Sequence, residues 1–267
     1  MKKLLVWDGD ETLWSGTVVE GDSAYISEER LILCEGLCAR GVLQSIATRN
    51  TEETLAEIVH RYSLDRWFLH NQASMTASKS QMIANILSAY GLSRADEVIF
   101  VDDNRFNREE VDSMYRGIST IHPNDLMLAV ELQFTKPQYT EEDRMRVQSY
   151  RSEQARQDYA KSYGDNRMKF LESCEMQMKV DKATYRQLPR LYDLFKRANQ
   201  TAAFSHAWNL DDLEHYVAME QITTAHVQDK FGHYGLVGAI VNDGPWIFGL
   251  AISCRLQGRG VGSALLG

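Results

Sequence analysis

Residues 2–14 read KKLLVWDGDETLW, an apolar run that ends in two acids one residue apart. A short, continuous apolar run is typical of a buried parallel strand, and ligands bind beyond the carboxyl ends of such strands in open α/β sheets. We therefore expect Asp8 and Asp10 to lie at the mouth of an active site. The alternative is a strand followed by an Asx turn, because Asp and Gly are ordinary turn residues.

Two further apolar runs in the first half of the chain also end in polar residues. Residues 42–47 lead into Thr48, and residues 97–101 lead into Asp102 and Asp103. Hydrophobic spacing predicts helices over residues 27–39, 52–62, 77–90 and 108–115, a weak strand at 67–69 and a short strand at 117–122. Strands that alternate with helices indicate a parallel sheet with right-handed crossovers, which places this half of the chain in the α/β class.

The polar groups at these strand ends share one chemistry if the strands are neighbours. An aspartate can act as a nucleophile toward phosphorus, while a nearby carboxyl group protonates the leaving oxygen. Carboxylates from two strand ends and a phosphate are the oxygen ligands that Mg²⁺ prefers. The hydroxyl of Thr48 and the ammonium of Lys79, near the start of helix 77–90, would hold the phosphoryl oxygens. Taken singly, each is better explained as a turn-forming or solvated residue, and only the combination favours a site.

This ordered set resembles the haloacid-dehalogenase-like phosphotransferase superfamily over about residues 2–130. The resemblance implies a Rossmann-like three-layer sandwich in which Asp8 is the nucleophile, Asp10 the acid/base and Thr12 the residue that fixes the turn. The catalytic residues that it implies are Asp8, Asp10, Thr48 and Lys79. The Mg²⁺ ligands that it implies are Asp8, Asp10 through its backbone carbonyl, Asp102 and Asp103.

The spacing of these motifs leaves no room for a large cap domain over the site. Only 35 residues separate Thr12 from Thr48, and 30 separate Thr48 from Lys79. We therefore expect an open phosphate site, which suits a protein that carries its substrate on an arm better than a small free metabolite. A cap supplied by the second half of the chain is the alternative.

The sequence pattern of the second half of the chain predicts another, smaller α/β domain. Residues 137–163 contain Thr140 followed by three acids at 141–143, a helix cap with acids in the first turn, and then many Arg, Gln and Glu residues, which indicates a long polar helix. We predict a phosphatase domain at 1–136, a helical linker at 137–173 and a second domain at 174–267. Its predicted elements are a strand from about residue 175, helices at 184–198 and 211–219, and strands at 222–227, 236–241 and 246–253.

The last predicted strand leads into QGRGVG at residues 257–262. Glycines before a helix let backbone N–H groups approach a pyrophosphate, although such a loop can also be a plain turn. The pattern resembles the acyl-CoA loop of GNAT acyltransferases, and the ligand-binding residues that it implies are Gln257, Gly258, Arg259, Gly260 and Gly262. Because the sequence ends at Gly267, barely into the helix, we expect a GNAT-like domain that is incomplete or reduced.

Cys254 stands just before this loop, between Ser253 and Arg255. Arg255 and Arg259 could lower the pKa of its thiol, as a nucleophilic cysteine requires. The alternative is a buried, inert cysteine.

The two halves together resemble the FkbH-like family of polyketide pathways over nearly the whole chain. The segments that carry this resemblance are DGDETLWSG, VDDN, RANQ, DKFGHYGLVG and SCRLQGR. The resemblance implies that the glyceryl group of 1,3-bisphosphoglycerate, or of a similar acyl phosphate, passes to the phosphopantetheine thiol of an acyl carrier protein. Phosphate is removed with Mg²⁺, and Cys254 is the candidate for a transient glyceryl thioester.

The chain departs from the usual pattern of that family in two places. Glu11 stands where Asn is common, and TAAF follows Asn199 and Gln200. Both departures leave the exact substrate open. Two other functions remain: a capless Mg²⁺-dependent phosphatase whose GNAT-like half only binds a partner or CoA, and a scaffold with degenerate sites. The intact set of acids counts against the scaffold.

Composition narrows the class of partner and the setting. The net charge of -8 argues against a general nucleic-acid binder, and a carrier protein would need a local basic face. The candidate residues for that face are Arg186, Arg190, Lys196 and Arg197, although a solvated charged face is the more common explanation of such a group. The four cysteines lack metal-ligand spacing and a disulfide framework, and the chain shows neither a signal-peptide layout nor a long apolar span. We therefore expect a cytoplasmic protein that binds no membrane.

Overall fold

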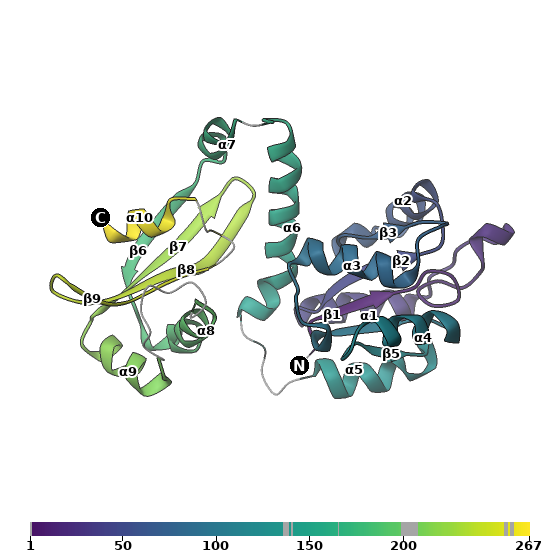
Figure 1. Ribbon diagram of the computed structural model, residues 1–267, viewed down its shortest axis with the longest axis horizontal. Coiled ribbons are helices and arrows are strands. Elements are labelled where there is room, and N and C mark those ends of the chain that lie inside the picture. Colours follow the sequence, from purple (N-terminus) through teal and green to yellow (C-terminus); the bar gives the residue numbers. More distant parts are fainter. Residues whose placement is uncertain are drawn as a thin grey trace. The chain divides into compact units, whose positions relative to one another are not determined.

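The computed structural model describes residues 2–135, 139, 141–164, 166–198, 208–253, 256 and 259–267 (Figure 1). The chain divides into two compact units, Met1–Arg151 and Ser152–Gly267. The division falls inside helix α6 (Glu141–Lys161), within the segment 137–173 for which the sequence predicts a linker. The limits predicted at residues 136 and 173 stay a prediction.

The first unit is built on a five-stranded sheet with β1 at its centre. The strand order is β3-β2-β1-β4-β5, and every neighbouring pair is parallel. The strands are β1 Leu4–Trp7, β2 Leu43–Thr48, β3 Gln72–Ala73, β4 Val98–Val101 and β5 Ser119–Ile121. Every residue of β1, β2 and β4 is buried, as the continuous apolar runs predict.

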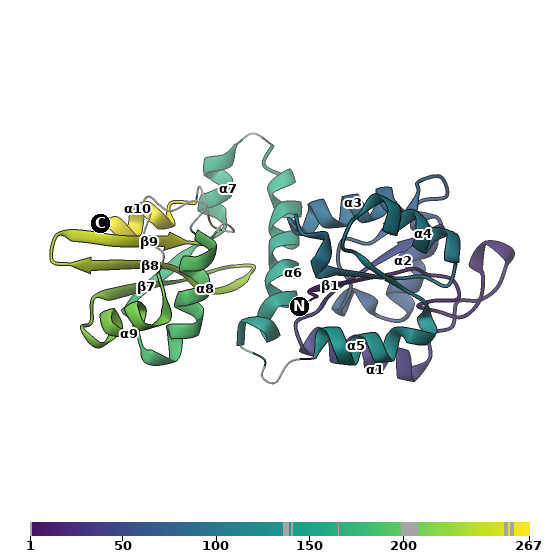
Figure 2. The ribbon, with the colours of Figure 1, turned by 60° about the horizontal axis from the view of Figure 1, so that its bottom comes forward.

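Helices cover both faces of this sheet and complete three layers (Figure 2). They are α1 Glu28–Ala39, α2 Glu52–Arg61, α3 Lys79–Tyr90, α4 Arg105–Met114 and α5 Leu126–Phe134. Short 3-10 helices occur at η1 Val18–Glu20, η2 Leu64–Arg66, η3 Ala95–Glu97 and η4 Pro123–Asp125. Leu5 and Trp7 of β1 pack in one core with α1, α2 and α5, whereas Leu4 and Val6 pack in the other with α3 and α4. The α/β, Rossmann-like part of the predicted fold is thus present.

The strand predicted at residues 67–69 is wrong. Phe68 makes only an isolated parallel bridge with Gln44, and the edge strand β3 forms later, where Gln72 and Ala73 pair with the end of β2. Trp67, Phe68 and Leu69 are nevertheless buried. These residues are apolar because they are buried in the core, not because they form a strand of the sheet.

A small hairpin is the main insertion near the carboxyl end of β1. Ser15 pairs with Tyr25, and η1 lies between them. The structure describes all of residues 2–48, and between β1 and β2 they hold only this hairpin and α1. Nothing in that insertion has the size of a cap domain.

The second unit contains an antiparallel sheet with the order β6-β7-β8-β9. Its strands are β6 Gln177–Lys182, β7 Ile222–Asp229, β8 Gly232–Asp243 and β9 Trp246–Ile252. Its other helices are α7 Arg167–Ser173, η5 Tyr185–Gln187, α8 Leu188–Ala198, α9 Leu210–Ala218 and α10 Val261–Leu266. Leu191 of α8 and Leu213 of α9 share a core with the sheet, and Val261 of α10 shares a second core with Val227 and Val237. The unit is α/β as predicted, whereas its GNAT-like identity stays a prediction.

Helix α6 is the long polar helix that the sequence predicts. Arg146, in the part that belongs to the first unit, donates to the carbonyl oxygen of Gly41 over 2.8 Å. Arg156, in the part that belongs to the second unit, is almost fully buried and pairs with Asp229 over 2.9 Å. No helix in the described part of the chain has both the length and the apolarity that a membrane span needs.

Candidate active site and metal centre

The candidate site lies where β1, β2 and β4 end side by side. Asp8 follows β1, Thr48 is the last residue of β2, and Asp102 and Asp103 follow β4. Since β1 connects onward to β2 on one side and pairs with β4 on the other, this is the position at which the strand order reverses. Ligands of doubly wound α/β sheets bind at such a switch point.

Lys79 enters the same site from the first residue of α3. Its ammonium forms a salt bridge with a carboxylate oxygen of Asp8 and donates to the carbonyl oxygen of Ala47 over 2.5 Å. The ammonium also lies 3.7 Å from Oδ2 of Asp102, and the Lys79 side chain is only 1% exposed. A buried lysine is stable in the charged form only with such partners, so the site is built around this ammonium.

Asp102 is held rigidly by the start of α4. The backbone N–H of Asn104 donates to Oδ1 of Asp102 over 2.8 Å, and the side-chain amide of Asn107 donates to both carboxylate oxygens, over 3.2 and 3.0 Å. Arg108 donates to the carbonyl oxygens of Asp102 and Asp103 over 2.6 and 2.8 Å. The backbone of the second acid pair is therefore fixed as well as its side chain.

The two acid motifs are also joined directly to each other. The backbone N–H of Asp103 donates to the hydroxyl oxygen of Thr12 over 3.0 Å. Thr12 lies in the turn after β1, where the N–H groups of Thr12 and Leu13 donate to the carbonyl oxygen of Gly9. This is how Thr12 can fix the turn, the part that the family resemblance implies for it.

Asp10 is oriented differently from the other three aspartates. Its Oδ1 accepts from the indole N–H of Trp14 over 2.7 Å, and its Oδ2 accepts from the amide of Asn50 over 3.1 Å. The same amide lies 2.9 Å from the hydroxyl oxygen of Thr48. The Asp10 carboxylate therefore lies beside Thr48 and outside the group of carboxylates that can share a metal. Its predicted part as a ligand through the backbone carbonyl stays a prediction.

Three carboxylates can share one metal ion. Ligand oxygens of Asp8, Asp102 and Asp103 all lie within 4.8 Å of one another. Asp102 is fully buried, Asp8 is nearly so, and Asp103 is exposed, so the group opens to solvent on one side. The ammonium of Lys79 contacts Asp8 and Asp102, and Asp103 adds a third carboxylate, so this group holds more negative oxygen than the ammonium neutralises. Such a set of carboxylates is what a hard divalent cation takes.

Burial and neighbouring charge raise the pKa values of Asp8 and Asp102. Burial raises the pKa of Asp8 above the ordinary value of an aspartate, and the nearby ammonium of Lys79 only partly offsets this. Burial, and then the negative charge of Asp8, raise the pKa of Asp102 to about 7. Without a cation, the protein therefore keeps protons on these carboxylates at pH values where an exposed aspartate is ionised.

Several residues of the site were not found from the sequence. Asn50, Asn107 and Arg108 contact the predicted residues, yet none of the three is an acid at a strand end. Gly9 was also not assigned a role, although its place between the two acids of the first motif was a signal. A Cβ atom there would lie 2.4 Å from the Trp14 ring and 2.5 Å from the Thr48 hydroxyl oxygen, so only glycine fits.

The predicted residues of the second unit are described only in part. Cys254, Gln257 and Gly258 lie outside the described residues, as do residues 199–207. Arg259 donates to Glu153 over 3.0 Å and is mostly buried.

Two glycines of the predicted loop are described, and each has a structural reason. Gly260 precedes α10 with a positive φ of 81°. A Cβ on Gly262 would lie 2.7 Å from the Cδ1 atom of Ile252, so packing alone accounts for that glycine.

The predicted basic face on α8 is partly used within the unit. Arg190 donates to the carbonyl oxygen of Leu236 over 3.0 Å, and the ammonium of Lys196 lies 5.6 Å from the ring centre of Tyr192. The side chain of Arg197 lies outside the described part of the structure. The part predicted for this face in docking a carrier protein stays a prediction.

Among the comparisons with known proteins, similarity is found with solved structures. A scan against protein-family models finds no match, and a search of the curated proteins finds no relative. Among solved structures, the chain is similar to the N-terminal part of the protein BF1531 from Bacteroides fragilis, which contains a phosphatase domain and is complexed with Mg. The identity is 24% and the TM-score 0.43, and the match covers 52% of this chain and 42% of that chain.

Proposed function

We propose that the first unit is a Mg²⁺-dependent phosphatase that works through an aspartyl-phosphate on Asp8. The observation that carries this proposal is the convergence of Asp8, Lys79, Asp102 and Asp103 at the switch point of the sheet. A structural ion pair would need one carboxylate for the lysine. Here two carboxylates contact the ammonium and a third, Asp103, lies within the same group, which leaves negative charge for a cation. A cation together with an ammonium suits a phosphoryl group.

The residues of the chain supply a complete route for the phosphoryl group. A carboxylate oxygen of Asp8 attacks phosphorus, the bond from phosphorus to the leaving oxygen breaks, and Asp10 gives a proton to that oxygen. Water then attacks the phosphorus of the aspartyl-phosphate and passes a proton to Asp10. The Asp8 carboxylate is restored, inorganic phosphate leaves, and Asp10 is protonated for the next cycle.

The surrounding groups bind and orient the substrate. Mg²⁺ would be held by Asp8, Asp102 and Asp103 and would supply positive charge to the phosphoryl oxygens. The ammonium of Lys79, which pairs with Asp8, supplies a second positive charge. The hydroxyl of Thr48 can donate to a phosphoryl oxygen. Trp14 and Asn50 hold the plane of the Asp10 carboxylate, which fixes where its proton is delivered.

The proposal extends to the substrate that the family resemblance implies. The thiol sulfur of Cys254 attacks the acyl carbon of 1,3-bisphosphoglycerate, the bond from that carbon to the phosphate oxygen breaks, and phosphate leaves. The thiol of an acyl carrier protein then takes the glyceryl group, which still carries its phosphate monoester, from Cys254. The first unit hydrolyses that monoester. The support is the set of segments such as SCRLQGR and VDDN, together with the absence of a cap-sized insertion between β1 and β2. A carrier protein would place this chemistry in the cytoplasm.

A second candidate is a phosphatase whose second unit only binds a partner or CoA. It requires the same chemistry at Asp8 and no thioester. Reaction of the chain with Mg²⁺, 1,3-bisphosphoglycerate and a carrier protein, followed by intact mass spectrometry, separates the two. Glyceryl transfer predicts a glyceryl adduct on the carrier protein that is lost in Cys254→Ala. Phosphate release with no adduct on either protein would leave the phosphatase and sink the transferase.

The phosphatase itself is tested by phosphate release from a simple aryl phosphate. Asp8→Asn keeps the size of the side chain but removes the nucleophile, so release falls to background. Asp112→Asn is the matched control, because Asp112 is an exposed acid on α4 of the same unit. Equal rates in the two variants would refute the proposal.

A further inference from the structure

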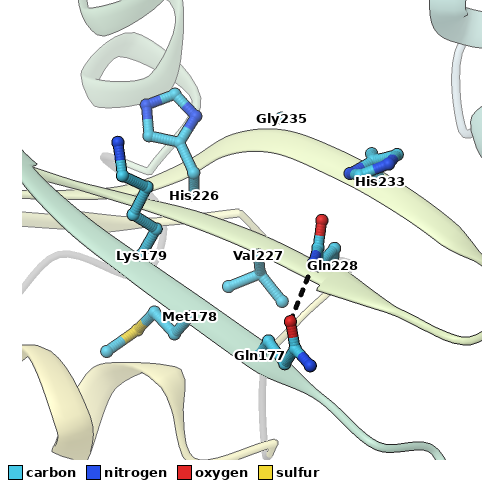
Figure 3. Close-up of a pocket in the computed structure, with 8 residues that line it drawn as sticks. All are labelled: Gln177, Met178, Lys179, His226, Val227, Gln228, His233 and Gly235. Carbon is cyan, nitrogen blue, oxygen red and sulfur yellow. Dashed lines mark hydrogen bonds between the residues drawn. The ribbon is translucent and has the colours of Figure 1, made fainter.

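The second unit holds a cavity that is lined by none of the site residues predicted from the sequence. It has a volume of about 360 Å³ and is formed by three neighbouring strands, β6, β7 and β8 (Figure 3). This volume falls in the range of small-molecule sites, which begins at about 300 Å³.

The strand register arranges the polar side chains of this cavity as a compact array. Lys179 of β6 lies directly opposite His226 of β7, and Gln228 of β7 lies opposite both Gln177 of β6 and His233 of β8. Figure 3 shows Lys179 and His226 projecting side by side from the strands. Directly opposite residues have Cβ atoms about 5 Å apart, so one small ligand can reach several of these groups.

Irregular pairing between β7 and β8 opens the space. The register shifts between Ala225 and His226 and again between Val227 and Gln228, and Tyr234 is left without a partner in the ladder. Gly235 adjoins this irregularity with a positive φ of 66°, and a Cβ atom there would meet nothing within 4 Å. Bulges of this kind re-aim side chains and are frequent beside binding sites.

Lys179 is the one charged side chain among the eight residues that line the cavity, and the side-chain amides of Gln228 and Gln177 are hydrogen-bonded to each other over 2.8 Å (Figure 3). The eight residues that line it include no acid. Lys179 does pair with Asp181 over 2.9 Å, but both side chains are well exposed, at 78% and 44%. Water screens such a pair, so an anion can compete for the Lys179 ammonium at little cost.

His226 presents a donor as well. Its Nε2 lies 3.1 Å from the amide nitrogen of Gln187, and the Gln187 amide oxygen accepts from the backbone N–H of Thr184 over 2.8 Å. Because an amide nitrogen only donates, the His226 ring accepts at Nε2 and carries its proton on Nδ1. The neutral ring thus keeps an N–H group for a ligand.

We propose that this cavity binds a small molecule through an oxyanion group, a phosphate monoester or a carboxylate. Lys179 supplies the charge, and His226 and His233 supply hydrogen bonds. The side-chain amide nitrogen of Gln228 already donates to Oε1 of Gln177 over 2.8 Å and has one further N–H group for a ligand. Gly235 provides the room. The site belongs to the second unit alone and does not depend on the phosphoryl chemistry of the first.

The test is an NMR titration of the histidine ring resonances, with inorganic phosphate and with acetate, on the full chain without Mg²⁺. Resonances of His226 and His233 are assigned with His→Gln variants, so binding in the first unit does not register. We expect saturable shifts of both rings. Saturation with phosphate alone identifies a phosphate monoester as the class, and saturation with acetate alone identifies a carboxylate.

Two pairs of variants decide whether the response comes from this cavity. Gly235→Asn fills it with a residue that tolerates a positive φ, and Gly244→Asn makes the same change in the β8–β9 turn, where φ is 54° and a Cβ also meets nothing. Lys179→Gln removes the charge, and Lys182→Gln does so elsewhere on β6. We expect the dissociation constant to rise at least about tenfold in the first member of each pair only. Shifts that do not saturate, or equal constants within both pairs, would overturn the proposal; Lys179→Gln decides alone if Gly235→Asn does not fold.

Discussion

Gly9 lies between the two acids at the end of β1, where a side chain has no room. A Cβ atom there would overlap the Trp14 ring and the Thr48 hydroxyl. We therefore expect Gly9→Ala to lower the free energy of unfolding of the first unit by about 1 to 3 kcal/mol, the usual cost of an overpacked position. Urea unfolding followed by tryptophan fluorescence measures it.

The control for that variant is Gly36→Ala in the middle of α1. A Cβ atom there meets nothing within 4 Å, so alanine is expected to stabilise the helix by about 0.5 to 1 kcal/mol. Stability of Gly9→Ala equal to that of the unchanged chain would show that the turn can relax, contrary to the packing described.

The pH dependence of stability follows from Asp8 and Asp102. Their pKa values are raised in the folded protein, that of Asp102 to about 7, so between about pH 4 and about pH 7 the folded chain holds protons that the unfolded chain has released. Without Mg²⁺, this contribution to stability is present at low pH and is lost as the pH rises through that window. Asp102→Asn should remove much of the dependence.

Stabilisation by Mg²⁺ is expected to increase as the pH rises, because protons and the cation compete for the same carboxylates. Thermal unfolding with and without Mg²⁺ should show a stabilisation by the cation that grows from pH 5 toward about pH 7 and then levels off. A stabilisation of the same size at pH 5 and pH 8 would mean that the cation binds elsewhere.

The residues of the site could be predicted to different degrees. The positions of Asp8, Thr48, Asp102 and Asp103 were predictable, because parallel strands bring their carboxyl ends together and the sequence marks those ends with polar residues. Lys79 lies at the start of a helix, and only its combination with the strand-end residues and the family resemblance pointed to it. The direction of the Asp10 side chain was not predictable, since at a strand end the chain turns and period-two alternation no longer applies.

At the scale of the elements, strands buried on both faces were the most predictable. β1 and β4 are continuous apolar runs followed by polar residues, and β2 is fully buried although it contains Gln44 and Ser45. β3 was misplaced because an edge strand of two residues has no pattern of its own, while the apolar residues before it are buried for another reason. Asn107 and Arg108 of α4 could not be assigned, because their contacts depend on how α4 begins after Asp102.

The turn between β7 and β8 provides a prediction at this scale. Asp229 accepts from Arg156 over 2.9 Å, from the hydroxyl of Tyr234 over 2.6 Å and from the backbone N–H of Phe231 over 2.9 Å. Asp229→Ala leaves the buried guanidinium of Arg156 without this partner. We expect a loss of about 3 to 5 kcal/mol in the stability of the second unit.

Hydrogen exchange read by mass spectrometry locates that loss. Peptides from β7 and β8 should exchange faster in Asp229→Ala and peptides from β1 and β2 should not. Asp243→Ala, an exposed acid in the next turn, is the control and should leave both unchanged. Unchanged protection of β7 in Asp229→Ala would show that Glu153, the other partner of Arg156, is sufficient.

At the scale of the whole molecule, the two units differ in how much of their proposed function is supported by described side-chain contacts. In the first, side chains from four elements meet in one place, and the proposed phosphoryl transfer is argued from their contacts. In the second, the sheet and helices are present, but Cys254 and part of the glycine loop at residues 257–262 lie outside the described residues. Glyceryl transfer therefore rests on sequence resemblance, whereas phosphoryl transfer rests on geometry.

The identity of the nucleophile is tested most directly by trapping the aspartyl-phosphate. The chain is mixed with Mg²⁺ and an aryl phosphate, quenched in acid during turnover, and digested for peptide mass spectrometry. We predict one phosphoryl group on Asp8, in the peptide that contains the turn after β1, and neither this group nor phosphate release in Asp8→Asn. Phosphate release by Asp8→Asn at the rate of the unchanged chain, with Asp8 unmodified throughout turnover, would contradict the assignment of Asp8 as the nucleophile.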